Sequence, residues 1–264
     1  SFCDCSPVIN MKVLPQVQAM PDRSAVAPKQ RSAVGLLVDG WPDDVRECIN
    51  ALIKFAPQHP LVVVDLGNVD GAGEVVDELA SQNEMTVFHI AQDLKTAGWA
   101  MARNAIIKAI PAEVHVIMDL STVLDGDAIS PLVDAISGDV VLSGWRGVNV
   151  NLEDEWRSFK DAETSGEVDA VLSYLMAVSR EAALRTPIDL KSRFYRNADL
   201  EWSLSLRAQG GKVVMPAAEL PCHQTRHRGY HDSDPEYREF ESKKTYNRLL
   251  KSFRSKDQIL APRS

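Results

Sequence analysis

The sequence predicts an α/β fold with a mostly parallel central sheet that is covered by helices on both faces. Short apolar runs alternate with stretches of about 10–15 residues whose apolar positions recur at helical spacing. The apolar runs are continuous rather than alternating, and several of them end at an Asp. Strands that are buried on both faces have this character, and crossover helices connect parallel strands. The pattern therefore predicts a series of βαβ units.

The elements follow in order from residue 34. Residues 34–38 form the first apolar run, and it ends at Asp39. Pro42 then opens a helix with apolar residues at helical spacing (Val45, Cys48, Ile49, Leu52, Ile53 and Ala56). Further strands are predicted at 61–64, 86–90, 114–118, 140–142 and 213–215. Further helices are predicted at 75–80, 98–110, 128–136, 196–207 and 235–253.

The first 33 residues have a different composition from the remainder of the chain. They carry four prolines and no sustained hydrophobic period, which predicts an extended arm or a linker. A strand that wraps around the domain is the alternative interpretation. Residues 34–264 are predicted to form one domain, which ends in a basic helix.

Charge and composition exclude several classes of protein. The 264 residues carry a formal charge of −8, and residues 221–264 carry +4, so the acidic body carries −12. An acidic body disfavours nucleic-acid binding, which depends on neutralising phosphates. No apolar run approaches the ~20 residues of a transmembrane helix. Because the four cysteines are scattered and no signal peptide is visible, we expect a cytoplasmic protein, or one bound peripherally at the inner membrane face.

Three carboxylates stand at the ends of predicted strands: Asp39, Asp65 and Asp119. In parallel sheets, ligands bind at the carboxyl ends of the strands. A single Asp at such a position is usually a turn residue or a helix cap, but three at matching positions predict a functional site. No Gly-rich phosphate loop follows the first strand, which disfavours a dehydrogenase or a P-loop ATPase.

Five segments in fixed order resemble the family 2 glycosyltransferases, which have the Rossmann-like GT-A nucleotide-sugar fold. The resemblance covers about residues 34–250 and rests on residues 62–71, 98–104, 116–121, 175–181 and 194–207. It implies an inverting transfer of a sugar from a nucleotide diphosphate donor to a hydroxyl group. The acceptor would be a saccharide, a lipid-linked molecule or a small molecule.

The resemblance also implies roles for the three strand-end carboxylates and for Asp199, which lies at the start of a predicted helix. Asp199 would be the general base, with a helix N-cap as the alternative. Asp119 would lie at the diphosphate and hold a divalent Mg or Mn ion. Asp65 would accept hydrogen bonds from the nucleobase, with Asp39 close by.

Other residues receive less specific roles from the same resemblance. Arg103 and Asn104 would lie near the nucleotide. His223 would approach the diphosphate or the metal ion, with nearby basic residues (Arg226, His227, Arg228 and His231) completing a diphosphate-facing loop. Trp145 and Tyr174 would stack on an acceptor sugar, or they would pack in the core.

Two departures from the family pattern leave alternatives open. Ser121 replaces the second carboxylate of the family's DxD motif, and hard cations prefer charged oxygens. Ala198 replaces the usual Glu before the base. The alternative function is a non-catalytic or degenerate nucleotide-sugar-binding module of a larger protein. A nucleotidyltransferase is a third interpretation, which the missing Gly-rich loop disfavours. The donor sugar, the base and the oligomeric state stay open.

Overall fold

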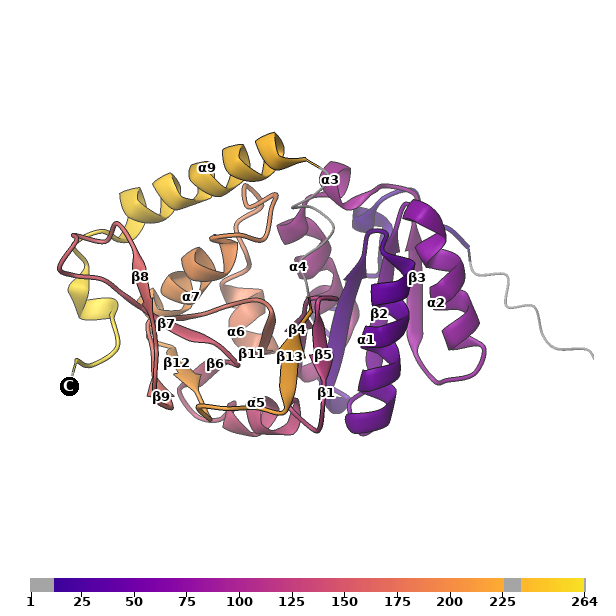
Figure 1. Ribbon diagram of the computed structural model, residues 1–264, viewed down its shortest axis with the longest axis horizontal. Coiled ribbons are helices and arrows are strands. Elements are labelled where there is room, and N and C mark those ends of the chain that lie inside the picture. The colour runs from indigo at the N-terminus through magenta and orange to yellow at the C-terminus, as the bar shows by residue number, and fades with distance from the viewer. Residues whose placement is uncertain (1–11, 226–233, 264) are drawn as a thin grey trace, which may run out of the picture.

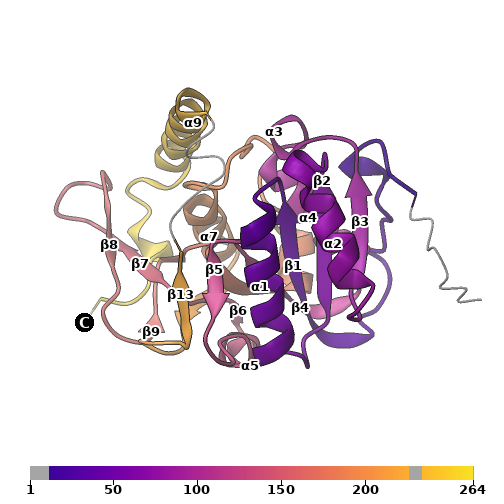
Figure 2. The same ribbon diagram turned by 45° about the vertical axis from the view of Figure 1, so that its right-hand side comes forward.

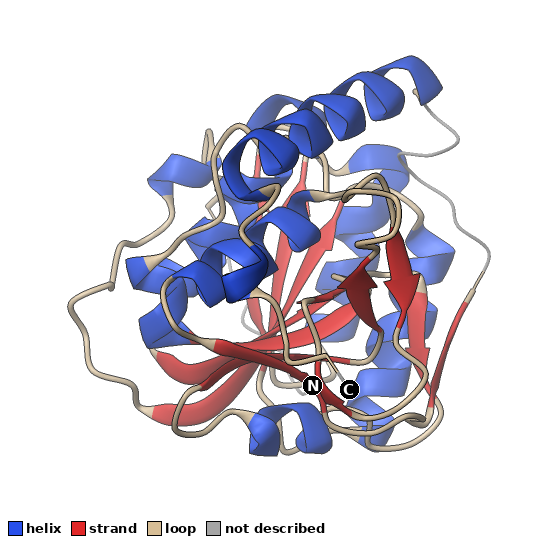
Figure 3. Ribbon diagram, turned by 90° about the vertical axis from the view of Figure 1, so that its left-hand side faces the viewer, coloured by secondary structure: helices blue, strands red, loops and turns tan. Residues whose placement is uncertain are grey.

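The computed structural model describes residues 12–225 and 234–263, and it has a central eight-stranded sheet between layers of helices (Figures 1 and 3). In spatial order, the strands are β3 (Thr86–Ile90), β2 (Leu61–Leu66), β1 (Gln30–Val38), β4 (Ala112–Met118), β11 (Leu175–Ser179), β6 (Val140–Gly144), β12 (Lys212–Met215) and β9 (Gly166–Glu167). This mixed α/β architecture, with a mostly parallel sheet, confirms the predicted fold class.

One strand inside the sheet runs against its neighbours. β1, β2, β3 and β4 are mutually parallel, whereas β11 is antiparallel to both β4 and β6. In register, Leu175 of β11 lies opposite Met118 at the end of β4. The start of β11 therefore lies at the edge where the parallel strands end, which is the edge that binds ligands in such sheets.

Apolar side chains fill a core on each face of the sheet. The helices are α1 (Pro42–Phe55), α2 (Ala72–Ala80), α3 (Leu94–Ala97), α4 (Trp99–Ala109), α5 (Ser130–Ala135), α6 (Arg180–Arg185), α7 (Ala198–Ala208) and α9 (Pro235–Phe253). α1, α2 and α5 cover one face, and α4, α6 and part of α7 cover the other. Cys48 is fully buried in the first core, as its helical position predicts. None of the described helices is both long and apolar enough to cross a membrane.

Two small sheets flank the central one. The first contains β10 (Ala170–Val171), β7 (Gly147–Val150) and β8 (Phe159–Asp161), and a third apolar cluster lies between this sheet, α7 and α9. The second pairs β13 (Cys222–Gln224) with β5 (Thr122–Leu124), which lie side by side in Figure 2. β5 begins four residues after β4 ends, so β13 reaches the edge where Asp119 follows β4.

Residues 12–29 lie against the domain. Leu14 forms a parallel bridge with Ile90, and Val17, in the short turn η1 (Val17–Ala19), is buried in the core beside α4. Arg180 donates to the carbonyl oxygens of Arg23 and Val26 at 2.7 and 3.0 Å. β1 begins at Gln30 rather than at residue 34, because Gln30 pairs with the first residue of β4.

Several other element boundaries differ little from those that the sequence predicts. α9 spans 235–253 and β3 spans 86–90, as predicted. The remaining turns are η2 (Val69–Gly71) and η3 (Asp257–Ile259). The strands β7 to β10 and the pair β5–β13 were not predicted, because strands of two to four residues are too short to show a hydrophobic period.

Candidate active site

Four aspartates gather at the carboxyl edge of the sheet. Asp39 follows β1, Asp65 lies near the end of β2, Asp119 follows β4, and Asp199 lies in the first turn of α7. Burial raises the pKa of Asp39 to about 6, and the charge of Asp65 contributes to this rise. Burial, Asp199 and Asp119 raise the pKa of Tyr174, which places both carboxylates close to that ring. The strand order and the position of α7 thus bring four aspartates that are far apart in the sequence to one edge of the sheet.

Asp199 is a buried carboxyl group whose hydrogen-bond partners are uncharged. Its exposed fraction is 5%. One carboxylate oxygen accepts the backbone N–H of Ser173 at 2.8 Å, and the other accepts that of Leu200 at 2.9 Å. Burial raises its pKa to about 6, and these hydrogen bonds offset part of that rise. A carboxylate in this state can take up a proton near neutral pH.

Asp119 forms a tight turn with the serine that replaces the second carboxylate of the family pattern. Its Oδ1 accepts the backbone N–H of Ser121 at 2.8 Å, and its own N–H donates to the carbonyl oxygen of Tyr174. The Ser121 hydroxyl accepts a hydrogen bond from the Gln224 side chain at 3.3 Å. A hydroxyl and an amide therefore occupy the region where a second acidic metal ligand is expected.

His223 does not complete a metal site with Asp119 in the described part of the chain. Its Nδ1 lies 2.7 Å from Asp125, and both side chains are half-exposed. Within residues 12–225 and 234–263, no three His, Cys, Asp or Glu side chains are grouped to hold a metal ion. The pairing with Asp125 uses Nδ1 and leaves Nε2 for a ligand, so the expected shared site of Asp119 and His223 stays a prediction. The rest of the predicted diphosphate-facing loop, residues 226–231, lies outside the described residues.

Asp65 is enclosed and held by a histidine that the sequence analysis missed. The β2–β3 register sets His89 opposite Asp65, with Nδ1 2.8 Å from Asp65 and Nε2 2.7 Å from Asp77. The hydrogen bond with Asp65 is the largest cause that raises the pKa of His89, which reaches about 9. The imidazolium thus donates to both carboxylates. The other oxygen of Asp65 is buried and has no hydrogen-bond partner among the described residues.

The helix above this aspartate requires a glycine. A Cβ added to Gly73 in α2 would lie 2.5 Å from the Asp65 carboxylate. Because Asp65 is only 1% exposed, a ligand that enters from solvent meets Asp39 first. The expected contact between Asp65 and a nucleobase therefore needs a movement that exposes its unpaired oxygen.

A small cavity lies beside Asp39. Its volume is about 180 Å³, and its lining includes Trp99 from α4, Tyr195 from the loop before α7, and Tyr237 from α9. Lys95 of α3 forms an ion pair with Asp234, which precedes α9, and its ammonium lies 4.7 Å from the Tyr237 ring centroid. Figure 1 shows the first turn of α9 beside α3. The cavity is smaller than typical ligand pockets of about 300–1,000 Å³.

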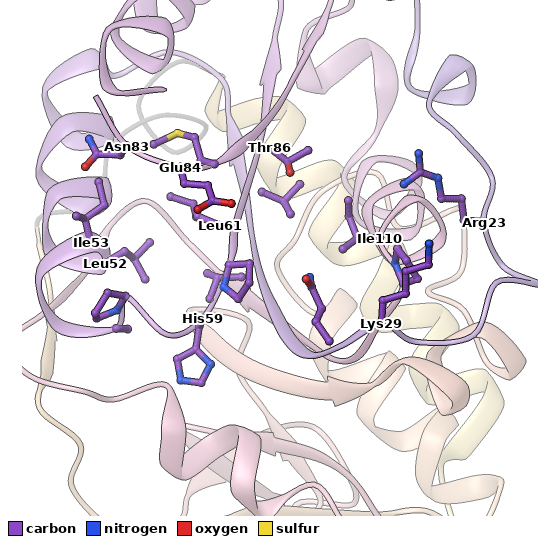
Figure 4. Close-up of a pocket in the computed structure, with 18 residues that line it drawn as sticks. Arg23, Lys29, Leu52, Ile53, His59, Leu61, Asn83, Glu84, Thr86 and Ile110 are labelled. Atoms are coloured by element: carbon purple, nitrogen blue, oxygen red, sulfur yellow. The ribbon is translucent and has the colours of Figure 1, made fainter. Parts of the chain in front are cut away.

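A larger cavity lies at the opposite edge of the sheet (Figure 4). Its volume is about 650 Å³, and Arg23, Lys29, His59 and the first residues of β1, β2 and β3 line it. None of the predicted site residues contributes to this lining. The carboxyl edge is therefore the candidate site, because it holds the titratable carboxylates and is the usual ligand edge.

Arg103 and Asn104 are buried and bind backbone groups, and their expected place near the nucleotide stays a prediction. Arg103 is 4% exposed and donates to the carbonyl oxygens of Gly35 and Met118 at 2.7 and 3.0 Å. Asn104 is 8% exposed, and its amide exchanges two hydrogen bonds with the Ile188 backbone. Both side chains satisfy buried backbone groups, so they stabilise the edge on which the site is built.

Trp145 and Tyr174 lie near each other, but a cation occupies the space beside their rings. The guanidinium carbon of Arg146 lies 4.5 Å from the Trp145 ring centroid and 5.7 Å from that of Tyr174. Both rings are half-buried and pack against the two cores. Arg146 was missed by the sequence analysis, although its place beside Trp145 after a predicted strand is a usable signal.

The chain matches one family of known proteins. The profile described as "Glycosyl transferase family 2" matches residues 41–194, which is more than half of the chain. No curated protein sequence gives a significant match.

Two solved structures are similar over most of the chain. One is GalNAc-T7 with UDP, GalNAc and Mn²⁺, with a TM-score of 0.67, 16% identity, and coverage of 84% of this chain and 48% of that one. The other is the mannosyltransferase PcManGT from Pyrobaculum calidifontis with GDP-Man and Mn²⁺, with a TM-score of 0.57, 17% identity, and coverage of 81% and 61%. The chain thus corresponds to only about half to three fifths of these proteins. At such identities the likeness shows the shared GT-A fold, and the profile match shows the family: the chain belongs to glycosyl transferase family 2.

Proposed function

We propose that the chain transfers a sugar from a nucleoside diphosphate sugar to a hydroxyl acceptor, with inversion at the anomeric carbon. Asp199 carries the proposal, because it is a buried carboxylate with a pKa of about 6, and its charge, like that of Asp119, acts on Tyr174. Family membership supports it, as do the UDP and GDP-Man in the two similar structures. The acceptor stays open among saccharides, lipid-linked molecules and small molecules.

The proposed step is a direct displacement. Asp199 takes the proton of the acceptor hydroxyl while that oxygen forms a bond to the anomeric carbon. The bond from this carbon to the diphosphate oxygen breaks, and the electron pair leaves with the nucleoside diphosphate. Attack opposite the leaving group inverts the configuration. Because its pKa is about 6, Asp199 is mostly ionised at neutral pH and can serve as the base.

The donor side of the site is built around Asp39. Asp39 lines the cavity, and its Oδ1 accepts the backbone N–H of Leu94 at 3.4 Å. Its remaining acceptor positions can receive hydrogen bonds from ribose hydroxyls or a nucleobase N–H. Asp65 supports this wall from within the sheet, where His89 holds it.

A divalent metal ion fits the described donors poorly. Both similar structures contain Mn²⁺, which neutralises charge on a diphosphate when bound. In this chain, Asp119 is followed by Ser121, and the described residues offer no group of three ligands. Mg²⁺ and Mn²⁺ favour several charged oxygens, so no part of the proposed step depends on the ion.

The second candidate is a degenerate module that binds nucleotide sugars without turnover. The serine at position 121 favours this candidate. A panel of UDP- and GDP-sugars would be tested for binding by calorimetry, and for transfer or hydrolysis by release of nucleoside diphosphate. Turnover by the natural chain, lost in Asp199→Asn with binding retained, supports the transferase. Binding without turnover supports the module, and no binding contradicts both.

A further inference from the structure

We propose that Arg146 binds the leaving diphosphate and supplies the positive charge that a metal ion with two acidic ligands supplies elsewhere. This inference rests on the proposed function, and it names the residue that compensates for Ser121. It follows from the position of Arg146, its contacts and its charge.

The backbone brings Arg146 to the site. It lies in the two-residue turn between β6 and β7, at the carboxyl end of β6. The N–H of the preceding Trp145 donates to Leu175, and Leu175 lies opposite Met118 in the register. Asp119 follows Met118 directly, and its N–H donates to Tyr174. Arg146 and Asp119 are therefore tied to the same end of β11.

The side chain points toward the residue that replaces the acidic ligand. Arg146 Nη1 donates to the Gln224 side-chain oxygen at 3.4 Å, and the Gln224 amide donates to the Ser121 hydroxyl at 3.3 Å. Gln224 thus links the guanidinium to position 121. The rings of Trp145 and Tyr174 also contact the guanidinium, and such contacts reduce the loss of rotamer freedom on binding.

The charge of Arg146 is not neutralised by a carboxylate. Within residues 12–225 and 234–263 it has no ion pair, whereas Arg207 and Arg263 each have one and Arg248 has two. The charges of Asp119 and Asp199 act on the Tyr174 ring that Arg146 contacts. A polyanion that approaches these two carboxylates is repelled unless a cation is present. Arg146 can supply that cation.

Guanidinium chemistry suits a diphosphate. Its planar N–H groups match two phosphate oxygens at once, and it stays charged at every relevant pH. When the bond to the anomeric carbon breaks, negative charge grows on the leaving oxygen. A fixed cation at that oxygen lowers the barrier. The contact needs the outer phosphate, so it distinguishes a diphosphate from a monophosphate.

The first experiment measures nucleotide binding after treatment with EDTA. UDP, UMP, GDP and GMP are titrated by calorimetry into the natural chain and into Arg146→Gln. We expect Arg146→Gln to weaken UDP or GDP by about ten- to a hundredfold, the range of a hydrogen bond to a charged group. The affinities for UMP and GMP should change by less than about threefold, which is less than the effect of losing one such hydrogen bond. Arg146→Lys keeps the charge, so its affinity for UDP or GDP should lie between those of the natural chain and Arg146→Gln.

Arg157→Gln is the matched control, because Arg157 is 76% exposed in the loop before β8 and its loss changes the net charge equally. It should leave all four affinities unchanged. Equal weakening of mono- and diphosphates by Arg146→Gln, or no weakening, contradicts the inference. A strict need for Mn²⁺ in diphosphate binding by the natural chain also contradicts it.

A second experiment restores the missing carboxylate. In Ser121→Asp, Mn²⁺ should strengthen UDP or GDP binding about tenfold or more, whereas the natural chain should change by less than about threefold. The double variant Ser121→Asp, Arg146→Gln should regain diphosphate binding only with Mn²⁺. If Mn²⁺ strengthens binding equally in the natural chain, the inference is wrong. If no nucleoside diphosphate binds the natural chain, the proposed function itself is wrong.

Discussion

The β2–β3 region and the start of α7 each hold a buried aspartate at the same edge of the sheet, but in different surroundings. Asp65 lies 2.8 Å from His89, whose pKa is raised to about 9. Asp199 accepts hydrogen bonds from uncharged groups of Ser173 and Leu200, and burial raises its pKa to about 6. Burial is similar, at 1% and 5% exposed, so the partner decides the chemistry.

The difference separates a supporting carboxylate from a reactive one. A buried carboxylate with a cationic partner is held charged and in place, and removing the cation is costly. A buried carboxylate without a cation is a stronger base, because the protein stabilises its proton. His89 thus holds the Asp65 carboxylate in place, whereas Asp199 can exchange a proton near pH 6. The following predictions test this contrast.

The largest expected effect belongs to Asp199. Asp199→Asn should lower sugar transfer by about 10²–10⁴-fold, because an amide cannot accept the acceptor's proton. Donor affinity, measured by calorimetry, should stay within about threefold. In the natural chain, kcat should fall as the pH drops through 6, since the base becomes protonated. An Asp199→Asn protein that keeps natural turnover would remove Asp199 from this role.

His89→Gln should cost stability in a pH-dependent way. The folded pKa of His89, about 9, exceeds its ordinary value of 6.5. The ion pairs therefore stabilise the fold fully below pH 6.5, and this contribution is lost as the pH rises through 9. The free energy of unfolding should fall by about 3 kcal/mol at pH 6, and the deficit should shrink towards pH 9.5. Urea unfolding at both pH values measures this.

His59→Gln is the matched control for this slope. Burial lowers the pKa of His59, whose two nitrogens lie 2.7 and 2.9 Å from Ser32 and Ser130. The contribution of His59 to stability falls at low pH rather than at high pH. The loss of unfolding free energy in His59→Gln should therefore be constant between pH 7 and 9.5. A deficit in His89→Gln that does not change with pH would show that the imidazolium is not what holds Asp65.

The sequence predicted elements better than it predicted contacts. α9 was placed correctly because its signals are local: Pro235 in the first turn, Asp234 as the cap, and a regular helical period. The reversed strand β11 and the opposition of Asp65 and His89 depend on strand order, which periodicity does not specify. His89 was visible only as a polar residue in an apolar strand.

The site residues show the same limit. Arg103 and Asn104 match the family motif in sequence, but the backbone carbonyls that they bind come from residues distant in the chain. Arg146 matched no motif, and its proposed role follows from the turn that brings it to Tyr174 and Gln224. The motifs therefore predicted which edge of the sheet holds the candidate site, whereas the partners of each side chain required the fold.

Asp39 gives a smaller expected effect on the donor side. If its carboxylate accepts hydrogen bonds from the nucleoside, the affinity for a UDP- or GDP-sugar, whose diphosphate does not titrate in this range, should fall about tenfold when the pH drops from 7 to 5, because Asp39 titrates near 6. Asp39→Asn should bind with nearly constant affinity over this range. Calorimetry at four pH values provides the test, with Asp43→Asn, at the exposed start of α1, as the matched control. The same slope in Asp39→Asn would assign the titration to another group.

The smallest expected effect belongs to the Lys95–Asp234 ion pair. Lys95 and Asp234 form an exposed ion pair between α3 and the start of α9, at the border of the 180 Å³ cavity. Exposed pairs contribute about 0–1 kcal/mol, so Lys95→Ala should change the free energy of unfolding by less than about 1 kcal/mol. Because the pair lies where α9 meets the cavity, its loss should still change UDP or GDP affinity by about threefold, which is about the effect of one weak contact.

Lys160→Ala, which breaks a comparable exposed pair with Glu153 away from the cavity, should leave affinity unchanged. Equal effects of the two substitutions on affinity would mean that this border takes no part in donor binding, and that the acidic edge binds its ligand through the strand ends alone.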